Sequence, residues 1–462
     1  MHLRNLVAEK SFYKKLLTLM LPIVLQSTIS SVVGLVDNVM VGQLTIESLS
    51  AVSITNQLMM IFNLSLFGAM AGGSIYGAQY HGQGNTEGMR YSFRLRLILA
   101  LVLAAGCIGA FSAFGTPLIQ RFLHQGADSS GDLALTLSEA QDYLHIILFS
   151  MVPFAMATAL SSALRDTGET FTPMVASVLS ILTNTLLNFV MIFGHLGFPA
   201  MGVRGAALAT VIARFVEFGY LYIRSYQQRE KHAFLVGAFK SFRLPLSDAR
   251  AMLITGLPML FNEGLWSVSN AMIVQCYSTR GLDAIAAINI CTSVFSLFAL
   301  VMGAMGTAIA ILLGQQLGSG DKERAYTMAW QLIALDLLIH IVLGGVMAAC
   351  SGLIPQLYEV APAVRDTAQQ LIIILACLLP MECVWQCGYY ILRAGGKTLI
   401  TFLFDCGFCW CVSLVLAKLL TACTGLSIVW IYGIVQGANI IKTVGSMIAV
   451  KSKIWLNTVT AK

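Results

Sequence analysis

Three carboxylates, Asp37, Glu263 and Glu382, lie within long apolar stretches of the chain. If those stretches cross a membrane, each carboxylate costs roughly 2.5–3.5 kcal/mol to insert, so one that is kept there usually serves a function. A carboxylate can take up a proton or, with amide and hydroxyl oxygens beside it, bind a hard cation. The alternative role is hydrogen bonding between helices. The expected chemistry is reversible binding of a small cation, with Glu263 and Glu382 as the candidate Na⁺ ligands.

Amide and hydroxyl side chains accompany these carboxylates. Some share a helical face with a carboxylate, since residues three, four and seven apart lie on the same side of a helix. One precedes a carboxylate directly, and two asparagines share a face of a separate apolar stretch. The candidate supporting ligands are Gln26, Asn184, Asn188, Asn262, Gln386 and Tyr389. For Asn184 and Asn188 a functional and a structural role are equally open.

The composition indicates that the elements carrying these residues cross a membrane. The chain is 57% hydrophobic and 11% charged, whereas soluble domains contain about 25% charged residues. The stretch 97–120 has no charged residue, and a bilayer-spanning helix needs about 20 mostly apolar residues. The apolar segments lack the period-two alternation of membrane barrels. The expected fold class is therefore an all-α polytopic membrane protein.

Twelve membrane spans are expected, and the chain is expected to divide into an N-terminal lobe (1–228, spans one to six), a cytoplasmic linker (229–250) and a C-terminal lobe (251–462, spans seven to twelve). The expected spans are 16–41, 50–80, 94–116, 142–164, 171–194, 203–225, 251–277, 285–316, 327–353, 368–391, 399–420 and 426–449.

The two lobes repeat one another in sequence. Leu21-Pro22 returns as Leu257-Pro258, and Gln79 returns as Gln315 at the same offset along the chain. The motif at 164–170 returns at 392–398, at a slightly shorter offset. Because six is an even number of crossings, both repeats insert in the same orientation. The lobes should therefore be related by a pseudo-two-fold axis along the membrane normal, an arrangement found in transporters.

Positive charge predicts the orientation. With the N-terminus inside, 22 of the 28 Lys and Arg residues fall on the cytoplasmic side, five fall outside, and Arg214 lies within a span. The 22 include Arg94 and Arg96, assigned to the loop after the second span, and Lys442. This asymmetry predicts cytoplasmic termini in a cell (plasma or inner) membrane. The net charge of +6 then reflects topology, and no nucleic-acid partner is expected.

Other motifs predict little chemistry. Cys406-x-x-Cys409 falls inside an expected span without a neighbouring histidine, so the eleven cysteines are interpreted as small buried hydrophobic residues. Asp336 and His340, four residues apart, are expected to form a structural pair, as are Arg214 and Glu217. Without a phosphate-binding glycine loop, ATP is not expected to drive the protein. No cofactor is expected.

Several motifs together resemble the multidrug and toxic compound extrusion (MATE) transporters. These motifs cover nearly the whole chain. They are Leu21-Pro22, the run Gly34-Leu35-Val36-Asp37-Asn38-Val39-Met40-Val41-Gly42, Leu49-Ser50-Ala51-Val52-Ser53, Ala78-Gln79-Tyr80-His81-Gly82-Gln83-Gly84, Leu164-Arg165-Asp166-Thr167-Gly168 and Gly202-Val203-Arg204-Gly205-Ala206-Ala207.

The resemblance implies two six-helix lobes in a V shape and assigns roles to the carboxylates. Asp37 matches the acidic residue of the family's N-lobe, and Glu263 and Glu382 match the C-lobe acidic pair of the NorM-like branch. Glu382 replaces an expected Asp, which keeps the charge on a longer arm. Another branch has an Asp where this chain has Asn188, which weakens the case for that branch's N-lobe proton site. If Glu263 and Glu382 form one site, their carboxylates must approach closely or share a ligand.

The function implied is export of organic compounds, cationic or amphipathic, by a monomeric antiporter coupled to Na⁺ or H⁺ and working by alternating access. One alternative is a flippase for lipid-linked saccharides from the same wider superfamily, which would need a strongly cationic cavity. Another is an intramembrane enzyme, which would need converging acid, base or metal-binding groups. His145, His195 and His340 fall on separate spans, so the enzyme is the weaker alternative. The sequence favours neither Na⁺ nor H⁺.

Overall fold

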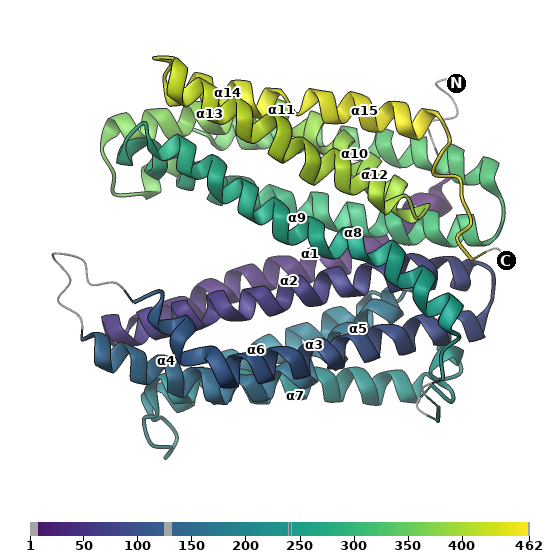
Figure 1. Ribbon diagram of the computed structural model, residues 1–462, viewed down its shortest axis with the longest axis horizontal. Coiled ribbons are helices and arrows are strands. Elements are labelled where there is room, and N and C mark those ends of the chain that lie inside the picture. Colours follow the sequence, from purple (N-terminus) through teal and green to yellow (C-terminus); the bar gives the residue numbers. More distant parts are fainter. Residues whose placement is uncertain (1–7, 124–131, 239, 242, 461–462) are drawn as a thin grey trace. The chain divides into compact units, whose positions relative to one another are not determined.

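The computed structural model describes residues 8–123, 132–238, 240–241 and 243–460, and within these ranges the chain is nearly all helix, with no strand (Figure 1). Arg4, the chain ends and two linker positions, 239 and 242, lie outside the described residues. The helices of the first half are α1 (Lys10–Gly42), α2 (Ile46–Gly82), α3 (Thr86–Gln120), α4 (Leu133–Ile147), α5 (Met151–Asp166), α6 (Phe171–Phe193) and α7 (Gly202–Gln227). Those of the second half are α8 (Leu246–Ser278), α9 (Leu282–Gly318), α10 (Lys322–Cys350), α11 (Pro362–Ala394), α12 (Thr398–Phe402), α13 (Leu414–Cys423), α14 (Ile428–Gly437) and α15 (Ile440–Lys451).

Eleven helical segments of the described chain are long and apolar enough to cross a membrane. Three of them combine shorter elements: α4 with α5, α12 with α13, and α14 with α15. The remaining expected span, 251–277, falls on the 33-residue helix α8, which carries Glu263 and is not among the eleven. These segments confirm the all-α polytopic membrane fold.

The internal repeat extends to the helix boundaries. Both α1 and α8 have 33 residues, and both α2 and α9 have 37. The two pairs begin and end at one common offset in residue number, and α3 and α10 begin at that offset too. It is the offset that relates Leu21-Pro22 to Leu257-Pro258. The C-terminal ends of α5 and α11 are instead separated by the shorter offset, the one that relates the motif at 164–170 to that at 392–398. The repeated sequence therefore folds into repeated elements.

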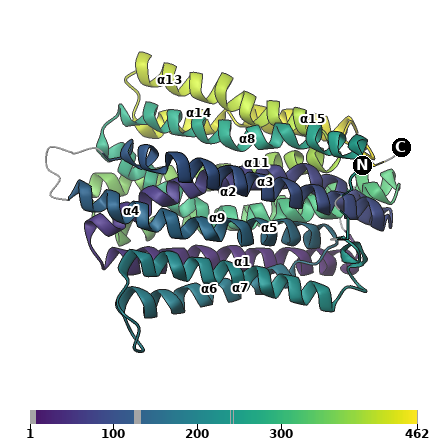
Figure 2. The ribbon, with the colours of Figure 1, turned by 60° about the horizontal axis from the view of Figure 1, so that its bottom comes forward.

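Contacts divide the chain into two compact units. The first comprises residues 1–24, 78–85 and 253–462, and the second comprises 25–77 and 86–252. The start of α1 belongs to the first unit because Leu16 and Leu19 pack in one apolar cluster with residues of α9, α10 and α11. In the second unit, α6 and α7 run side by side (Figure 2).

A local two-fold relation joins the ends of α2 and α9 within the first unit. A Cβ atom on Gly82 would lie 1.9 Å from the backbone oxygen of Gln315, and one on Gly318 would lie 2.0 Å from the backbone oxygen of Gln79. These are equivalent positions of the two repeats, and such a reciprocal contact is the signature of two-fold symmetry. Only glycine fits at either crossing point.

The segment Trp455–Thr460 is fastened to the same place. The buried amide of Gln79 donates to the carbonyls of Ala394 at 2.9 Å and Asn457 at 3.3 Å, and it accepts from the Val459 N–H at 2.8 Å. The exposed Gln83 side chain donates to Thr460 at 2.6 Å. The C-terminal segment is thus held to α2 mainly through one buried side chain.

The Gln79→Ala variant is expected to release this segment. Two of the three lost hydrogen bonds go to the segment, each with a net value of about 1 kcal/mol, so amide hydrogen exchange across residues 455–460 should accelerate at least tenfold. Gln83→Ala is the matched control, because it removes one exposed bond and should accelerate exchange much less. Equal exchange in wild type and Gln79→Ala would contradict this account of how the segment is held.

Two features of the second half shape the surroundings of the acidic residues. Pro380 precedes Glu382 by two residues within α11 and cannot donate to the carbonyl of Ala376. A Cβ atom on Gly344 of α10 would lie 2.6 Å from that carbonyl oxygen, so the close approach of the carbonyl to α10 requires a glycine at position 344. Beyond α12, the π-helical turns η5 (Leu403–Gly407) and η6 (Cys409–Ser413) follow, and η5 carries Asp405. Such turns often occur at functional sites.

Candidate functional site

Asp37 of α1 is held by two asparagines of α6. The Asn188 amide donates to Asp37 Oδ1 at 3.1 Å, and Asn188 is almost fully buried. The side-chain amide of Asn184 makes hydrogen bonds with both its nitrogen and its oxygen when the nitrogen faces Asp37. In this orientation the nitrogen donates to Asp37 Oδ2 at 2.9 Å, and the oxygen accepts from Thr210 Oγ1 at 3.1 Å. The structure therefore brings together three of the residues that the sequence singled out.

Two further residues complete this acidic cluster. Thr210 of α7 contacts Asn184, and Tyr143 of α4 hydrogen-bonds to Thr210 and interacts electrostatically with Asp37. Neither residue was selected from the sequence, because a threonine or tyrosine within an apolar helix usually fills core space. We call Asp37, Asn184, Asn188, Thr210 and Tyr143 the Asp37 cluster.

Gln26 does not lie in the Asp37 cluster. Its side chain donates to Ser177 at 2.7 Å and accepts from Arg165 at 3.0 Å. Eleven residues of helix separate Gln26 from Asp37, which corresponds to about 16 Å along α1. Ser177 in turn donates to Glu217 at 3.1 Å.

Arg214 and Glu217 of α7 pair at 2.8 Å, as expected for a structural pair. The Arg214 guanidinium also lies over the Phe154 ring, 4.3 Å from its centre.

Glu382 of α11 has a direct amide partner. Asn439, between α14 and α15, donates to Glu382 Oε1 at 2.7 Å and to Gln436 Oε1 at 3.2 Å. Asn439 is buried and Glu382 is half-buried. Asn439 was not among the residues selected from the sequence.

Asp405 connects the two predicted glutamates. It accepts from Asn262 at 3.0 Å and pairs with Lys442 at 3.5 Å, and it interacts electrostatically with both Glu263 and Glu382. No hydrogen bond joins Glu263 to Glu382 among the described residues. Asp405 is thus a negatively charged neighbour of both glutamates, and a site shared by Glu263 and Glu382 stays a prediction. We call Asn262, Glu263, Glu382, Asp405, Asn439 and Lys442 the Asp405 cluster.

Lys442 corrects the charge-based topology at one position. It had been counted among the cytoplasmic cations, but it lies in α15, is 7% exposed, and its ammonium is 4.8 Å from the centre of the Trp385 ring. Asp405, whose nearest cations along the chain are Lys397 and Arg393, pairs with Lys442 instead. The reason is spatial, since α15 packs against both η5 and α11.

The other two predicted ligands of the second half lie near this cluster. The Tyr389 hydroxyl contacts the Met259 sulfur at 3.4 Å and is an electrostatic neighbour of Glu263 and Asp405. Gln386 is half-buried, and no hydrogen bond joins it to Glu382 within the described chain.

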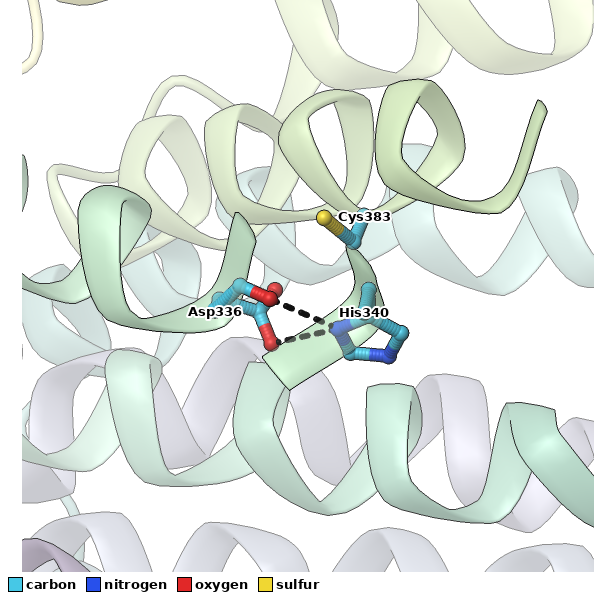
Figure 3. Close-up of side chains that lie close together, drawn as sticks. All are labelled: Asp336, His340 and Cys383. Carbon is cyan, nitrogen blue, oxygen red and sulfur yellow. Dashed lines mark hydrogen bonds and ion pairs between the residues drawn. The ribbon is translucent and has the colours of Figure 1, made fainter. Parts of the chain in front are cut away.

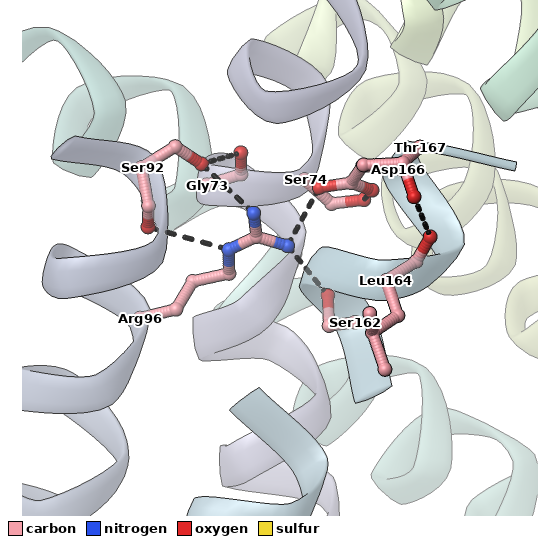
Figure 4. A network of polar contacts seen from close by, with 8 residues as sticks. All are labelled: Gly73, Ser74, Ser92, Arg96, Ser162, Leu164, Asp166 and Thr167. Atoms are coloured by element: carbon pink, nitrogen blue, oxygen red, sulfur yellow. Dashed lines mark hydrogen bonds and ion pairs between the residues drawn. The ribbon is translucent and has the colours of Figure 1, made fainter. Parts of the chain in front are cut away.

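A buried ion pair lies at the start of α3 (Figure 4). Arg96 pairs with Asp166 at 2.7 Å, and both side chains are at most 1% exposed. Arg96 also donates to Ser162 at 2.8 Å and Ser92 at 2.9 Å, and Ser74 donates to Asp166 at 2.6 Å. Arg96 had been assigned to a cytoplasmic loop. The helix begins at Thr86, eight residues earlier than expected.

Arg94, also assigned to that loop, is buried as well. Its guanidinium donates to the carbonyls of Gly237, Ala238 and Arg243, and thereby fastens the linker after α7 to α3. The linker is thus ordered against one helix by backbone contacts that composition cannot indicate.

Comparison with known proteins agrees with this architecture. The family model described as MatE matches residues 22–190 and 258–419. The two matched segments begin at Pro22 and Pro258, the equivalent prolines of the repeats, and therefore cover both repeats.

Individual relatives point the same way. A probable multidrug resistance protein NorM from Thermotoga maritima is 29% identical over 331 residues, which are 72% of this chain and 69% of the relative. A FAD transporter from Shewanella oneidensis is 26% identical over 347 residues, 74% of this chain and 74% of the relative. A solved structure, described as the outward-facing conformation of a multidrug resistance MATE family transporter of the MOP superfamily, matches with a TM-score of 0.84 at 19% identity. The match covers 98% of this chain and 97% of that one. Because the family model matches most of the chain, across both repeats, the chain belongs to the MATE family of membrane transporters.

Proposed function

We propose that this chain is a cation-coupled antiporter of the NorM-like branch, which exports organic compounds, cationic or amphipathic, by alternating access. The observation that carries the proposal is an acidic cluster among the helices of each unit: the Asp37 cluster in one and the Asp405 cluster in the other. In both, amide groups hold a carboxylate that a proton or Na⁺ can neutralise.

The energy available to such a carrier is sufficient. Moving one elementary charge across 100 mV supplies about 2.3 kcal/mol, which shifts a two-state equilibrium about 50-fold. Neutralising a buried carboxylate changes the electrostatic energy of the helices around it. Binding of H⁺ or Na⁺ at either cluster can therefore favour one of two conformations, and the coupling cation is one of these two.

The buried cations of the described chain favour export over flipping of a lipid-linked saccharide. A flippase would need free positive charge for the pyrophosphate group. Arg96 pairs with Asp166, and Lys442 pairs with Asp405. The third buried cation, Arg94, is occupied by three backbone carbonyls of the linker. The names of the relatives, which include multidrug resistance proteins and a FAD transporter, support a small organic molecule as the exported compound.

The proposal is tested in proteoliposomes with a fluorescent organic cation. Inward Na⁺ and H⁺ gradients are imposed separately on the purified chain. Uphill movement of the dye with one gradient, abolished by an ionophore that dissipates it, is the expected result. Dye movement that ignores both gradients would overturn cation coupling. Movement of a lipid-linked saccharide without movement of the dye would overturn export.

The proposal also places the protein as a monomer in the cell or inner membrane, with both termini in the cytoplasm. Arg94, Arg96 and Lys442 are buried, so we no longer count them as exposed cytoplasmic cations. Of the 22 Lys and Arg residues assigned to the cytoplasmic side, 19 remain. A reporter fused after residue 462 that is active only in the cytoplasm should be active, and an inactive fusion would overturn the orientation.

Glu263→Gln and Glu382→Gln are each expected to reduce coupled export to a similar degree, roughly tenfold, because Asp405 links both glutamates electrostatically. The double variant should be little worse than either single one, since residues in one network are not additive. Initial rates of dye transport in proteoliposomes measure this.

Glu323→Gln is the matched control, because Glu323 is exposed and pairs only with Lys453 at 3.4 Å among the described residues. It should leave transport unchanged. Independent, additive losses in the two single variants would show that Glu263 and Glu382 belong to separate sites.

A further inference from the structure

Two pairs of metal-binding side chains face one another on α10 and α11. Asp336 and His340 are four residues apart on α10, and Cys383 and Cys387 are four residues apart on α11. Residues four apart lie on the same face of a helix, and these two helices pack together. All four residues are at most 1% exposed.

Three of these side chains, Asp336, His340 and Cys383, lie within reach of one metal ion (Figure 3), and Cys387 contacts one of the three. A carboxylate oxygen of Asp336, a ring nitrogen of His340 and the sulfur of Cys383 all lie within 4.8 Å of one another. His340 Nδ1 is 2.9 Å from Asp336 Oδ1, and the Cys387 thiol donates to Asp336 Oδ2 at 3.0 Å. Cys383 is directed by a contact of its thiol with the Pro380 carbonyl at 3.1 Å.

Packing alone does not account for this cluster. Burying a carboxylate and an imidazole is costly unless their polar atoms are satisfied. Asp336 Oδ1, the carboxylate oxygen that faces His340 Nδ1, is buried and accepts no hydrogen bond among the described residues. A buried unsatisfied polar atom requires an explanation, and one explanation is a bound ion or water. The sequence predicts small hydrophobic cysteines and an isolated Asp336–His340 pair, because it shows each helix separately. The structure brings the two helices together.

We propose that Asp336, His340, Cys383 and Cys387 bind a thiophilic divalent cation of the Zn²⁺ class. One carboxylate, one imidazole and two thiolates make a four-ligand set of the types that Zn²⁺ takes. Tetrahedral zinc places its ligand atoms roughly 3.3–3.8 Å apart, so movements of about 1 Å bring Asp336, His340 and Cys383 to these distances. Cys387, whose thiol contacts Asp336 at 3.0 Å, supplies the fourth ligand by turning toward the same point. Binding releases the two thiol protons to solvent.

Such an ion joins α10 to α11 beside the Asp405 cluster. Glu382 directly precedes Cys383, and both Glu382 and Asp336 interact electrostatically with Cys383. Occupancy therefore restrains the turn of α11 that presents Glu382. This role is distinct from cation coupling, because the ion is held by sulfur and nitrogen ligands that neither H⁺ nor Na⁺ exchange requires.

The test measures metal binding by the purified full-length protein in detergent. After treatment with a chelator and addition of Zn²⁺, elemental analysis of the wild type should give one zinc per chain. Co²⁺ substituted for zinc should give the visible bands of a tetrahedral site and a near-ultraviolet thiolate-to-cobalt band. The Cys383→Ser/Cys387→Ser double variant should lose that band, and His340→Gln should weaken Zn²⁺ binding at least tenfold.

The matched control is Cys406→Ser/Cys409→Ser, which changes two buried cysteines elsewhere in the same unit and should bind as the wild type does. If the Cys383→Ser/Cys387→Ser variant fails to fold, zinc X-ray absorption of the wild type still decides, because it reports sulfur and nitrogen or oxygen neighbours directly. Less than one zinc per chain, an oxygen-and-nitrogen shell without sulfur, or a thiolate band that persists in the Cys383→Ser/Cys387→Ser variant would overturn the proposal. None of these results depends on transport, so the site can fail while cation coupling stands.

Discussion

Asp37→Asn is expected to abolish uphill export while leaving the fold intact, with a loss of coupled transport of well over tenfold. An amide cannot take up a proton at neutral pH or neutralise a cation. The hydrogen bonds that hold position 37 can persist, because the asparagine oxygen still accepts from Asn188, the partner of Asp37 Oδ1. Coupling should thus be lost without a cavity or an unpaired charge.

Proteoliposome transport against a concentration gradient of the dye measures this. Downhill movement should continue, since the substitution removes the coupled cation and not the path. Asp142→Asn is the matched control in the same unit, because Asp142 is 36% exposed and pairs with the exposed Arg204. Uphill export by Asp37→Asn at the wild-type rate would make Asp37 a structural residue.

Arg96→Met is expected to be the most destabilising single substitution considered. It removes the guanidinium that pairs with the buried Asp166 carboxylate, and breaking a buried pair in this way costs about 3–5 kcal/mol. Ser74 would still donate to the carboxylate, but a hydroxyl does not neutralise its charge. The space is also closed, since a Cβ atom at Gly77 would lie 2.3 Å from Asp166 Oδ2, so little room exists for water to enter.

Thermal unfolding in detergent, followed by intrinsic fluorescence, should show a drop of roughly 10 °C or more. The double variant Arg96→Met/Asp166→Asn should recover at least half of that loss, because it removes the buried negative charge as well. Arg204→Met, which breaks an exposed pair of 2.8 Å in the same unit, should cost about 0–1 kcal/mol. If Arg96→Met melts like Arg204→Met, the buried pair contributes no more than a surface one.

The apolar runs and their repetition were sufficient to predict the helices. Spans such as 171–194 and 285–316 lie within a few residues of α6 and α9, because a membrane helix must be long and apolar and few other segments meet that requirement. The constant offset between the repeats matched α1 to α8 and α2 to α9 before any contact was known. Asp37, Glu263 and Glu382 were found for the same reason, since a carboxylate in an apolar run costs energy and is therefore conspicuous.

Only the tertiary structure decided which side chains meet. Lys442, Arg94 and Arg96 were counted as cytoplasmic cations because each lies near the end of an expected span, yet neighbouring elements bury all three charges. Asp405 could not be paired with Lys442, nor Asn439 with Glu382, because helical periodicity describes the faces of one helix and not which faces pack together. The same limit separated Asp336 and His340 from Cys383 and Cys387: their spacing on each helix is visible in the sequence, but their proximity arises from the packing of α10 against α11.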